Sequence, residues 1–555
     1  MKKTTLFIIG LSLAIFILFV PQIQANNPRS LMPLLTNPIP LVPPNQCVLQ
    51  ESSPGLAPQN DPVIWRYNLT RLFSLQPTSD GNYIAAGEKD PQRLWVAKLS
   101  GNGSTLWEKT YQVGPFGSGG LVQETQEGGF IVVGTLTAGA PLENILVLKL
   151  TATGLTEWQK VYTSAEDDIP KAIRQTSDGG YVIVGYKNVP YPDAQLGYDQ
   201  AMLVTKLNAD GSVLWYKTIK GSEGFDIAYD VQETSEGDYV VVGQSRISGY
   251  LRVWVGKFDN SGAIIWQNSY SASGGIEHGG YTVIVTANDQ YLVGGQLSIP
   301  GVTRISAWSL MLNSNGTPIW EKMYQGNAQN GDELNGFRTL MATSDGGFLG
   351  AGFSFTGFAT PHNGWTVKLN STGDVTWSTK VDLGSTSDES FFGLASLPTG
   401  GYMFAGTRWS LGTSGHQHDA LIVQTNENGV IPGCSSVTNM PLTTGPANVI
   451  VATANLTTNN YSVTPTETTI TPESVQSVQQ ILCSAGPTPT PSPTSTATGT
   501  PTATATATTT QTPTPTGSPS ATPSSTPTMT PSPTSTATVV PPENQQFLPF
   551  LSSNP

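Results

Sequence analysis

The sequence lacks the short motifs that most often carry catalysis. It has no Walker loop, no nucleophile elbow, no metalloprotease helix and no paired-cysteine metal motif, although it holds 58 glycines. The glycines lie instead in turn-forming stretches between apolar runs, which is their usual place in hairpins. Nothing in these patterns calls for a cofactor, and none is expected.

Cysteine is scarce as well, with only Cys47, Cys434 and Cys483 in 555 residues. Three cysteines fit an oxidising compartment, in which one disulfide forms and one thiol is left over. Cys434 follows Trp377 by one repeat length, so we expect it to end the last repeat and to pair with Cys483. The alternative is a bond between Cys47 and Cys434, which would join the two ends of the repeat region.

Charged residues make up only 12% of the chain, and the formal net charge is −13. This acidic balance disfavours nucleic-acid phosphates and anionic membranes as partners. The one long apolar run, residues 6–20, follows Lys2 and Lys3 and precedes a small-residue cleavage site at Ala25. The arrangement predicts a signal peptide over residues 1–25 and a secreted protein. The alternative, an uncleaved anchor, needs about 20 apolar residues.

Two aromatic markers recur in phase along the chain, which is the mark of a repeat architecture. A tryptophan returns in steps of 42 to 57 residues, in most units four residues after a turn glycine, and a second aromatic follows a separate tight turn. We expect each indole to be buried between neighbouring sheets. The tryptophans are Trp65, Trp107, Trp158, Trp215, Trp266, Trp320 and Trp377, and the other aromatics are Tyr83, Phe130, Tyr181, Tyr239, Tyr291, Phe348 and Tyr402.

One repeat, from Val213 to Lys257, predicts four short strands joined by three turns. Small four-stranded sheets that repeat about a centre form a propeller. The sequence therefore predicts an all-β fold, a seven-bladed β-propeller of four-stranded blades over residues 63–434. The strand that contains Trp65 precedes the first unit, so we expect it to supply the outer strand of the seventh blade.

The stretch from Leu207 to Trp215, LNADGSVLW, resembles the tryptophan-docking repeat of quinoprotein-type propellers. The stretch from Thr176 to Gly185, TSDGGYVIVG, is similar to bacterial secreted propeller repeats of that superfamily. The resemblance implies a way of packing blades, shared by quinone-dependent dehydrogenases and by non-catalytic scaffolds. It does not extend to the quinone site, because the family's adjacent cysteines have no counterpart here.

One position in the loop before each innermost strand is polar in most units, eight residues before the next tight turn. Such loops gather at one face of a propeller, so these side chains are candidates for binding a cation or a basic ligand around the channel mouth. The alternative is that each side chain caps its own loop. The candidates are Asp168, Asp226, His278, Asn335 and Glu389.

Two further sets of residues have a chemical and a structural interpretation. His416, His418 and Asp419 are weak metal candidates, because the pattern lacks a third histidine or a glutamate to complete a zinc site. Five lysines recur in the third strand and are expected to be solvated residues on a blade edge, although such a ring could attract an anionic polymer. The lysines are Lys98, Lys149, Lys206, Lys257 and Lys368.

The flanks of the repeat region have compositions of their own. Residues 26–62 are a linker, and the Thr-rich extension 435–484 has β-branched residues enough for one or two added strands. Residues 485–541 are almost wholly Pro, Thr, Ser, Ala and Gly and predict a disordered stalk. Residues 542–555 form a short apolar tail that could attach to the cell envelope.

These features together predict a secreted or cell-surface propeller that binds or scaffolds an extracellular protein or glycan and is not an enzyme. The alternative is an extracellular enzyme that acts at the channel mouth, either a polysaccharide-active hydrolase or lyase or a quinoprotein-like oxidoreductase.

Overall fold

The structure is a computed structural model of the chain. All the residues that it describes lie within the unit Met1–Thr488. The predicted signal peptide 1–25, the linker 26–62 apart from Pro62, Cys47, the stalk 485–541 and the tail 542–555 lie outside the described residues. The described residues are 62–68, 70–89, 93–114, 119–137, 142–190, 198–272, 277–298, 305–326, 333–355, 361–398, 400–412, 415–445, 449–454, 456–460, 464–467, 473–474 and 479–484.

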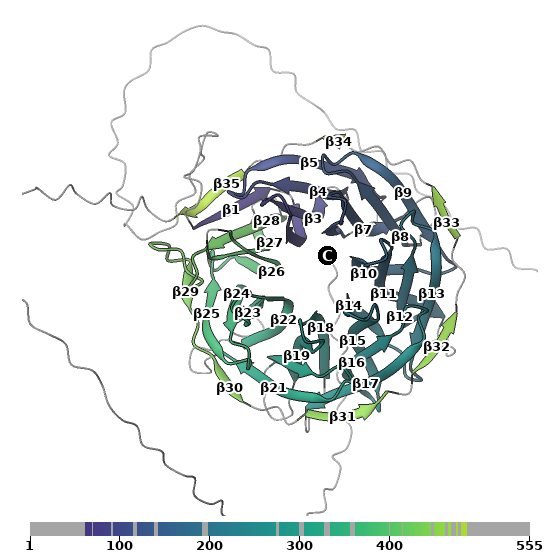
Figure 1. Cartoon of the computed structure of the whole chain (residues 1–555). Coiled ribbons are helices and arrows are strands. Elements are labelled where there is room, and N and C mark those ends of the chain that lie inside the picture. The colour runs from purple at the N-terminus through teal and green to yellow at the C-terminus, as the bar shows by residue number, and fades with distance from the viewer. Residues whose placement is uncertain are drawn as a thin grey trace, which may run out of the picture. The chain divides into compact units, whose positions relative to one another are not determined.

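Every regular element in this part of the chain is a β-strand. Four strands that follow one another pair antiparallel to form a small twisted sheet, and such sheets stand side by side around a central axis, as blades do in a propeller (Figure 1). Two neighbouring sheets are joined by a single parallel bridge between Leu251 and Glu277. In the described segments no helix is long and apolar enough to cross a membrane.

The strands take the same order in each sheet, counted outward from the axis. The innermost strands are β2 (Thr70–Pro77), β6 (Leu121–Glu124), β10 (Asp168–Gln175), β14 (Ile227–Glu233), β18 (Glu277–Val285), β22 (Glu333–Ala342) and β26 (Ser387–Ser396). The second strands are β3 (Tyr83–Lys89), β7 (Phe130–Leu136), β11 (Tyr181–Pro190), β15 (Tyr239–Ile247), β19 (Tyr291–Ser298), β23 (Phe348–Phe355) and β27 (Tyr402–Gly412). The third strands are β4 (Arg93–Leu99), β8 (Asn144–Leu150), β12 (Tyr198–Leu207), β16 (Tyr250–Phe258), β20 (Ile305–Leu312), β24 (Asn363–Leu369) and β28 (Gly415–Thr425). The fourth strands are β5 (Thr105–Gln112), β9 (Thr156–Thr163), β13 (Val213–Lys220), β17 (Ile264–Ala272), β21 (Pro318–Gln325), β25 (Val375–Val381) and β1 (Val63–Asn68).

The first strand of the repeat region completes the last sheet. β1 pairs antiparallel with β28, with Val63 opposite Gln424 and Asn68 opposite Asp419. The two ends of the repeat region are thereby joined through backbone hydrogen bonds, and neither is left as an open sheet edge.

The apolar cores lie between neighbouring sheets rather than in one central mass. Val147 of β8 and Ile183 of β11 belong to one buried cluster, and Val204 of β12 and Val241 of β15 belong to the next. Second and third strands are apolar on both faces because each face meets another sheet. This explains the continuous apolar runs after the tight turns.

The recurring tryptophans pack one sheet against the next. Trp215 of β13 lies against the α-carbon of Gly262, in the turn between β16 and β17, so closely that an added Cβ would be 2.9 Å from its ring. The glycine has a positive φ of 76°, which favours a residue without a side chain. The same contact recurs from Trp65 to Gly103 and from Trp377 to Gly429. Trp65 is 3% exposed, and the other six marker tryptophans are partly buried.

The third-strand lysines are buried, so the expectation that they are solvated is wrong. Lys206 is 1% exposed and its Nζ lies 2.9 Å from a carboxylate oxygen of Asp178, in the turn between β10 and β11. Lys368 makes the same contact to Asp345 at 2.8 Å. Each lysine therefore ties an outer strand to the turn of its own sheet, and its charge is balanced there rather than presented to solvent.

The Thr-rich extension forms a belt around the outside of the sheets. We use this name for residues 437–484, whose seven described strands each add a fifth strand to one sheet (Figure 1). The belt visits the sheets in the reverse of their order along the chain. Its strands, each with its partner, are β29 (Val437–Asn439) on β25, β30 (Thr443–Gly445) on β21, β31 (Val449–Thr453) on β17, β32 (Thr457–Asn460) on β13, β33 (Thr464–Glu467) on β9, β34 (Glu473–Ser474) on β5 and β35 (Gln479–Ser484) on β1.

A disulfide between Cys434 and Cys483 closes the belt. The two residues are 49 apart in the sequence, with their α-carbons 6.1 Å apart. Cys434 directly precedes the belt, and Cys483 lies in β35, beside β1 and β28. The bond therefore joins the two ends of a segment that passes along the outer edge of every sheet, and it excludes the alternative pair of Cys47 with Cys434.

Candidate binding site in the central axis

The predicted polar positions are buried and stand at or near the start of the innermost strands. Asp168, Asp226 and Glu389 are 0% exposed, and His278 is 1% exposed. Each belongs to a different sheet. Asn335 lies in β22, and its side chain is outside the described atoms.

The two aspartates each hold the loop in front of their own strand. Asp168 accepts a hydrogen bond from Nζ of Lys187, the residue opposite it on β11, at 3.3 Å. Asp226 accepts from the backbone N–H of Gly221 at 2.7 Å and from the hydroxyl of Ser245 on β15. Burial raises the pKa of Asp226 to about 6. Asp226 accepts hydrogen bonds at both oxygens, whereas Asp168 accepts at Oδ1 only, and its buried Oδ2 has no partner among the described residues.

The glutamate and the histidine act in the same way. Glu389 accepts from the backbone N–H of Leu383 at 3.5 Å and lies 3.6 Å from Nε of Arg408, the residue opposite it on β27. Nε2 of His278 accepts from the backbone N–H of Ala272 at 2.7 Å. Burial raises the pKa of Glu389 to about 8 and lowers that of His278 to about 4. The structure brings none of these side chains together, and the described residues hold no group of three metal-ligating side chains.

The weak metal candidates are engaged elsewhere. His418 and Asp419 are neighbours on β28, so their side chains point to opposite faces of the strand. Nε2 of His418 lies 2.7 Å from Nη2 of Arg71, and Asp419 pairs with Arg66 at 3.6 Å. The side chain of His416 lies outside the described atoms.

Sequence reasoning missed a different set of residues around the axis, one in or directly before each innermost strand. In six sheets this residue is the extra one of a β-bulge, where pairing with the second strand skips a residue. A bulge re-aims a side chain away from its regular place in the sheet. In the sheet of β6 the corresponding residue is a glycine. We call these the axial residues: Phe73, Gly120, Lys171, Tyr229, Tyr281, Arg338 and Phe392.

A glycine on the second strand makes room for each bulge. An added Cβ on Gly185 would be 2.0 Å from the carbonyl oxygen of Ile169, two residues before the bulged Lys171. On Gly243 it would be 2.1 Å from the carbonyl oxygen of Ile227. Two non-bonded atoms cannot approach so closely, so a side chain at this position would clash with the bulged strand. The repeated glycine is therefore what allows the innermost strand to bulge.

The axial side chains meet one another across sheet boundaries. The rings of Tyr229 and Tyr281 make an edge-to-face contact with centroids 5.0 Å apart, and the guanidinium of Arg338 lies 4.4 Å from the ring centroid of Tyr281. On the other side, the rings of Phe73 and Phe392 make an edge-to-face contact at 6.2 Å. All the axial side chains with a Cβ are partly exposed, so solvent reaches them.

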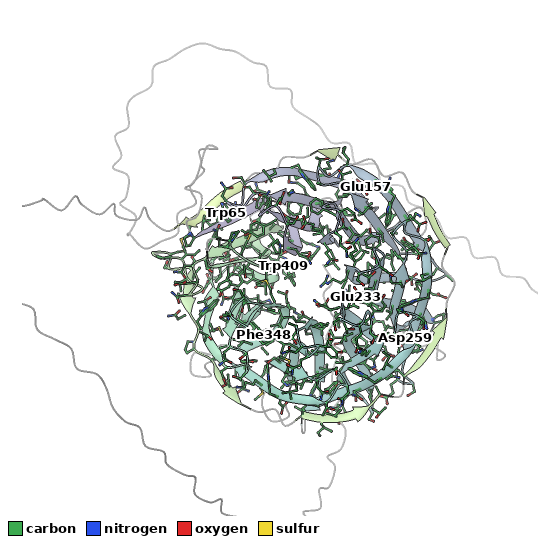
Figure 2. The ribbon with its side chains drawn as sticks, in the orientation of Figure 1. Trp65, Glu157, Glu233, Asp259, Phe348 and Trp409 are labelled. Atoms are coloured by element: carbon green, nitrogen blue, oxygen red, sulfur yellow. A yellow bond between two sulfur atoms is a disulfide. The ribbon has the colours of Figure 1, made fainter. Side chains whose placement is uncertain are left out.

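The axis therefore has two chemically different sides. Lys171, Tyr229, Tyr281 and Arg338 come from four consecutive innermost strands and form a cationic side, whereas Phe392 and Phe73 form an apolar side. Figure 2 shows side chains reaching toward the centre, with the labelled Glu233 at the end of β14 close to it. A ligand at the axis would meet cations and hydroxyls on one side and aromatic rings on the other.

A sequence signal for the axial residues does exist. Each stands five residues before the first residue of the tight turn, as Lys171 does before Thr176 and Tyr229 before Thr234. The polar loop positions stand eight residues before the same turn, and their polar character drew attention to the wrong register. A bulge cannot be recognised from one repeat, because the extra residue breaks the alternation on which strand patterns depend.

No protein-family model and no curated protein matches the chain. Solved structures with a similar course include the polysaccharide lyase Uly1, with 10% identity, a TM-score of 0.38 and coverage of 71% of this chain and 94% of that chain. A mutant of NanB sialidase from Streptococcus pneumoniae has 11% identity, a TM-score of 0.35 and coverage of 70% and 72%. An endo-1,5-alpha-L-arabinanase from Thermotoga petrophila has 12% identity, a TM-score of 0.23 and coverage of 66% and 98%.

These likenesses carry no argument about activity. The resemblance of the repeats to the quinoprotein-type superfamily stays a prediction.

Proposed function

We propose that the chain is a secreted, surface-associated, seven-bladed β-propeller that binds an extracellular ligand at its axis without turning it over. Seven is the count of four-stranded groups when the two that share one parallel bridge are taken as separate blades and β1 is assigned to the last. The predicted stalk 485–541 would hold the propeller away from the cell.

The observation that carries this proposal is a contrast between positions of the repeat. Positions that build the sheets keep one residue type, as the docked tryptophan and the glycine opposite the bulge do. The axial position is the bulged residue in six of the sheets, yet there it holds Phe, Lys, Tyr, Tyr, Arg and Phe, and in the sheet of β6 it is a glycine. A residue needed for folding would repeat, so the variety at this position supports a role in binding.

The axial chemistry favours binding over proton transfer by the tyrosines. Burial raises the pKa of both Tyr229 and Tyr281, so both keep their hydroxyl protons and act as hydrogen-bond donors. A general base works best with a pKa close to the ambient pH.

The experiment is to present the full chain to an array of extracellular glycans and proteins, together with the double variant Tyr229→Ala/Tyr281→Ala. The matched control is Tyr250→Ala, since Tyr250 lies at the tip of the β15–β16 hairpin and is 46% exposed. We expect a class of ligand that the wild type and the control bind and the double variant does not. Melting curves show that each variant is folded.

Two outcomes would overturn the proposal. A ligand that the double variant binds as well as the wild type would place the site on another surface. New products released from a polysaccharide would establish the alternative, an extracellular enzyme, and the same panel is scored for turnover because similar solved structures are named as a lyase, a sialidase and an arabinanase.

A further inference from the structure

Lys171 and Arg338 differ from the buried lysines of this protein. The buried lysines are paired with acids, as in Lys206 with Asp178 at 2.9 Å, and the partly exposed Arg174 is paired with Asp230 at the same distance. Within the described residues, neither Lys171 nor Arg338 has such an ion pair. Nε of Arg338 is buried and has no hydrogen-bond partner there. A cation that is largely withdrawn from water and has no counter-charge is costly unless something else supplies the negative charge.

The charges of Lys171 and Arg338 influence each other across the axis. Burial is the main cause that lowers the pKa of Lys171. The charge of an acid, Glu143, acts against it, and the charge of Arg338 lowers the pKa by a smaller effect, although β10 and β22 are separated by the sheets of β14 and β18. Burial and the charge of Asp167 raise the pKa of Glu143, and the charge of Lys171 lowers it. The cationic side of the axis therefore holds two cations without a direct ion pair in the described part of the chain, and one acid, Glu143, whose charge acts on Lys171.

The neighbouring aromatic residues hold this site in shape. The guanidinium of Arg338 lies over the rings of Tyr281, at 4.4 Å, and Phe353, at 5.3 Å. Cation–π contacts fix the plane of a guanidinium and leave its N–H groups directed at a ligand. The hydroxyls of Tyr229 and Tyr281 lie between the two cations in the order of the sheets and can donate to the same ligand.

We propose that this side of the axis binds the anionic group, a carboxylate or a sulfate ester, of an acidic polysaccharide, with Lys171 and Arg338 as its cationic partners. The inference rests on the proposed function. Arg338 suits a two-oxygen acceptor because its planar fork can donate two parallel hydrogen bonds. Phe73 and Phe392, on the other side of the axis, can take the apolar face of a sugar ring, which a small inorganic anion would not need. The overall negative charge of the chain makes long-range attraction of polyanions weak, so selectivity would come from this local pair.

The test measures binding of the full chain to three soluble probes by calorimetry at low and moderate salt. Oligogalacturonate carries carboxylates, dextran sulfate carries sulfate esters, and dextran is neutral. We expect one or both anionic probes to bind and dextran not to, with affinity that falls as salt rises. The comparison of the two anionic probes decides which acid group is preferred.

Two variants remove the charges one at a time, Lys171→Met and Arg338→Leu. Each should weaken binding of the anionic probe by about tenfold or more, as expected for loss of a charge-assisted hydrogen bond. Arg338→Lys keeps the charge without the fork and should retain part of the affinity. The matched control is Lys322→Met on the outer strand β21, which changes the net charge equally and should bind as the wild type does.

The outcomes separate this inference from the proposed function. Binding of dextran or a protein that is lost in Tyr229→Ala/Tyr281→Ala but unchanged in Lys171→Met and Arg338→Leu would overturn the inference and leave the axial site standing. Anion binding weakened equally by Lys322→Met would mean nonspecific attraction and would overturn it too. Binding that no axial variant affects would overturn both. If either charge variant does not fold, Arg338→Lys alone decides. A loss of affinity for the anionic probe would support the inference, and an unchanged affinity would overturn it.

Discussion

Trp215 and Gly262 hold two neighbouring sheets together. The indole covers the glycine's α-carbon, and its Nε1–H donates to the carbonyl of Asn260, in the same turn, at 3.0 Å. One residue thus contributes an apolar face and a hydrogen bond to the turn of the next sheet. Because the arrangement recurs around the ring, it is the repeated unit of sheet-to-sheet adhesion.

Replacement of Trp215 by Ala should lower the free energy of unfolding by on the order of 3 kcal/mol, because it leaves a cavity against the next sheet. The matched control is Leu214→Ala, since Leu214 is adjacent on β13 and 53% exposed. The control should change stability by less than about 0.5 kcal/mol. Urea unfolding followed by tryptophan fluorescence measures both. Equal effects of the two substitutions would contradict the docking role.

Removal of the disulfide should open the belt. The bond closes a loop of 49 residues, and the loss of loop-closure entropy in the unfolded chain gives about 4 kcal/mol of stabilisation. We expect Cys434→Ala/Cys483→Ala to unfold at clearly lower denaturant, with faster amide exchange in residues 437–484 before exchange rises in the inner sheets. Cys47→Ala is the control and should behave as the wild type. Unchanged exchange in the belt strands would contradict a closing role for the bond.

Gly243→Ala should be among the most damaging conservative changes in the chain. The new Cβ would be 2.1 Å from the carbonyl oxygen of Ile227, and relief of that clash requires the bulge at Tyr229 to move. We expect a loss of about 3 kcal/mol or more. Gly237→Ala tests the cost of positive φ alone, because its Cβ would meet nothing within 4 Å, and it should cost about 1 kcal/mol.

Stability should fall as the pH rises toward 8, and Glu389 should be a cause. Its pKa is raised from 4.5 to about 8 by burial, so the folded chain holds a proton that the unfolded chain has lost over this range. Unfolding then releases a proton, and the free energy of unfolding falls by up to about 1.4 kcal/mol per pH unit. Glu389→Gln should remove this slope.

The clearest window for that measurement lies above the ordinary pKa of His278, 6.5, because this buried histidine makes stability fall in the opposite direction, toward acid. Melting temperatures of the wild type and Glu389→Gln from pH 6.5 to 8 provide the comparison. Parallel profiles would mean that Glu389 is ionised in the folded chain, neutralised by Arg408.

The all-β architecture could be predicted from the sequence because one repeat recurs several times along the chain. A tryptophan four residues after a glycine, as in Trp215 after Gly211, repeats too often to be chance. The disulfide between Cys434 and Cys483 could likewise be predicted, since Cys434 stands where the repeat ends. Periodic positions can be compared with one another even in a single chain, and this comparison takes the place of an alignment.

Features that break the period could not be predicted in the same way. The belt was expected to add one or two strands, and it adds seven, because stretches such as Val449–Thr453 carry no pattern that states which edge they join. Lys206 was expected to be solvated, because alternation on an outer strand does not reveal the acid of a turn 28 residues earlier. The axial position of Arg338 was not predicted, because the bulge shifts the neighbouring residues out of the alternating strand pattern.

The reverse course of the belt sets the order in which the sheets can be completed as the chain is synthesised. The sheet of β2 to β5 is synthesised first, yet its outer strand β34 is the last but one to leave the ribosome, and β1 waits for β35. In a nascent chain, sheets therefore lack their fifth strand from the time the first sheet forms until nearly all of the belt has emerged. A chain truncated before residue 437 would leave the outer edge of every sheet without its fifth strand.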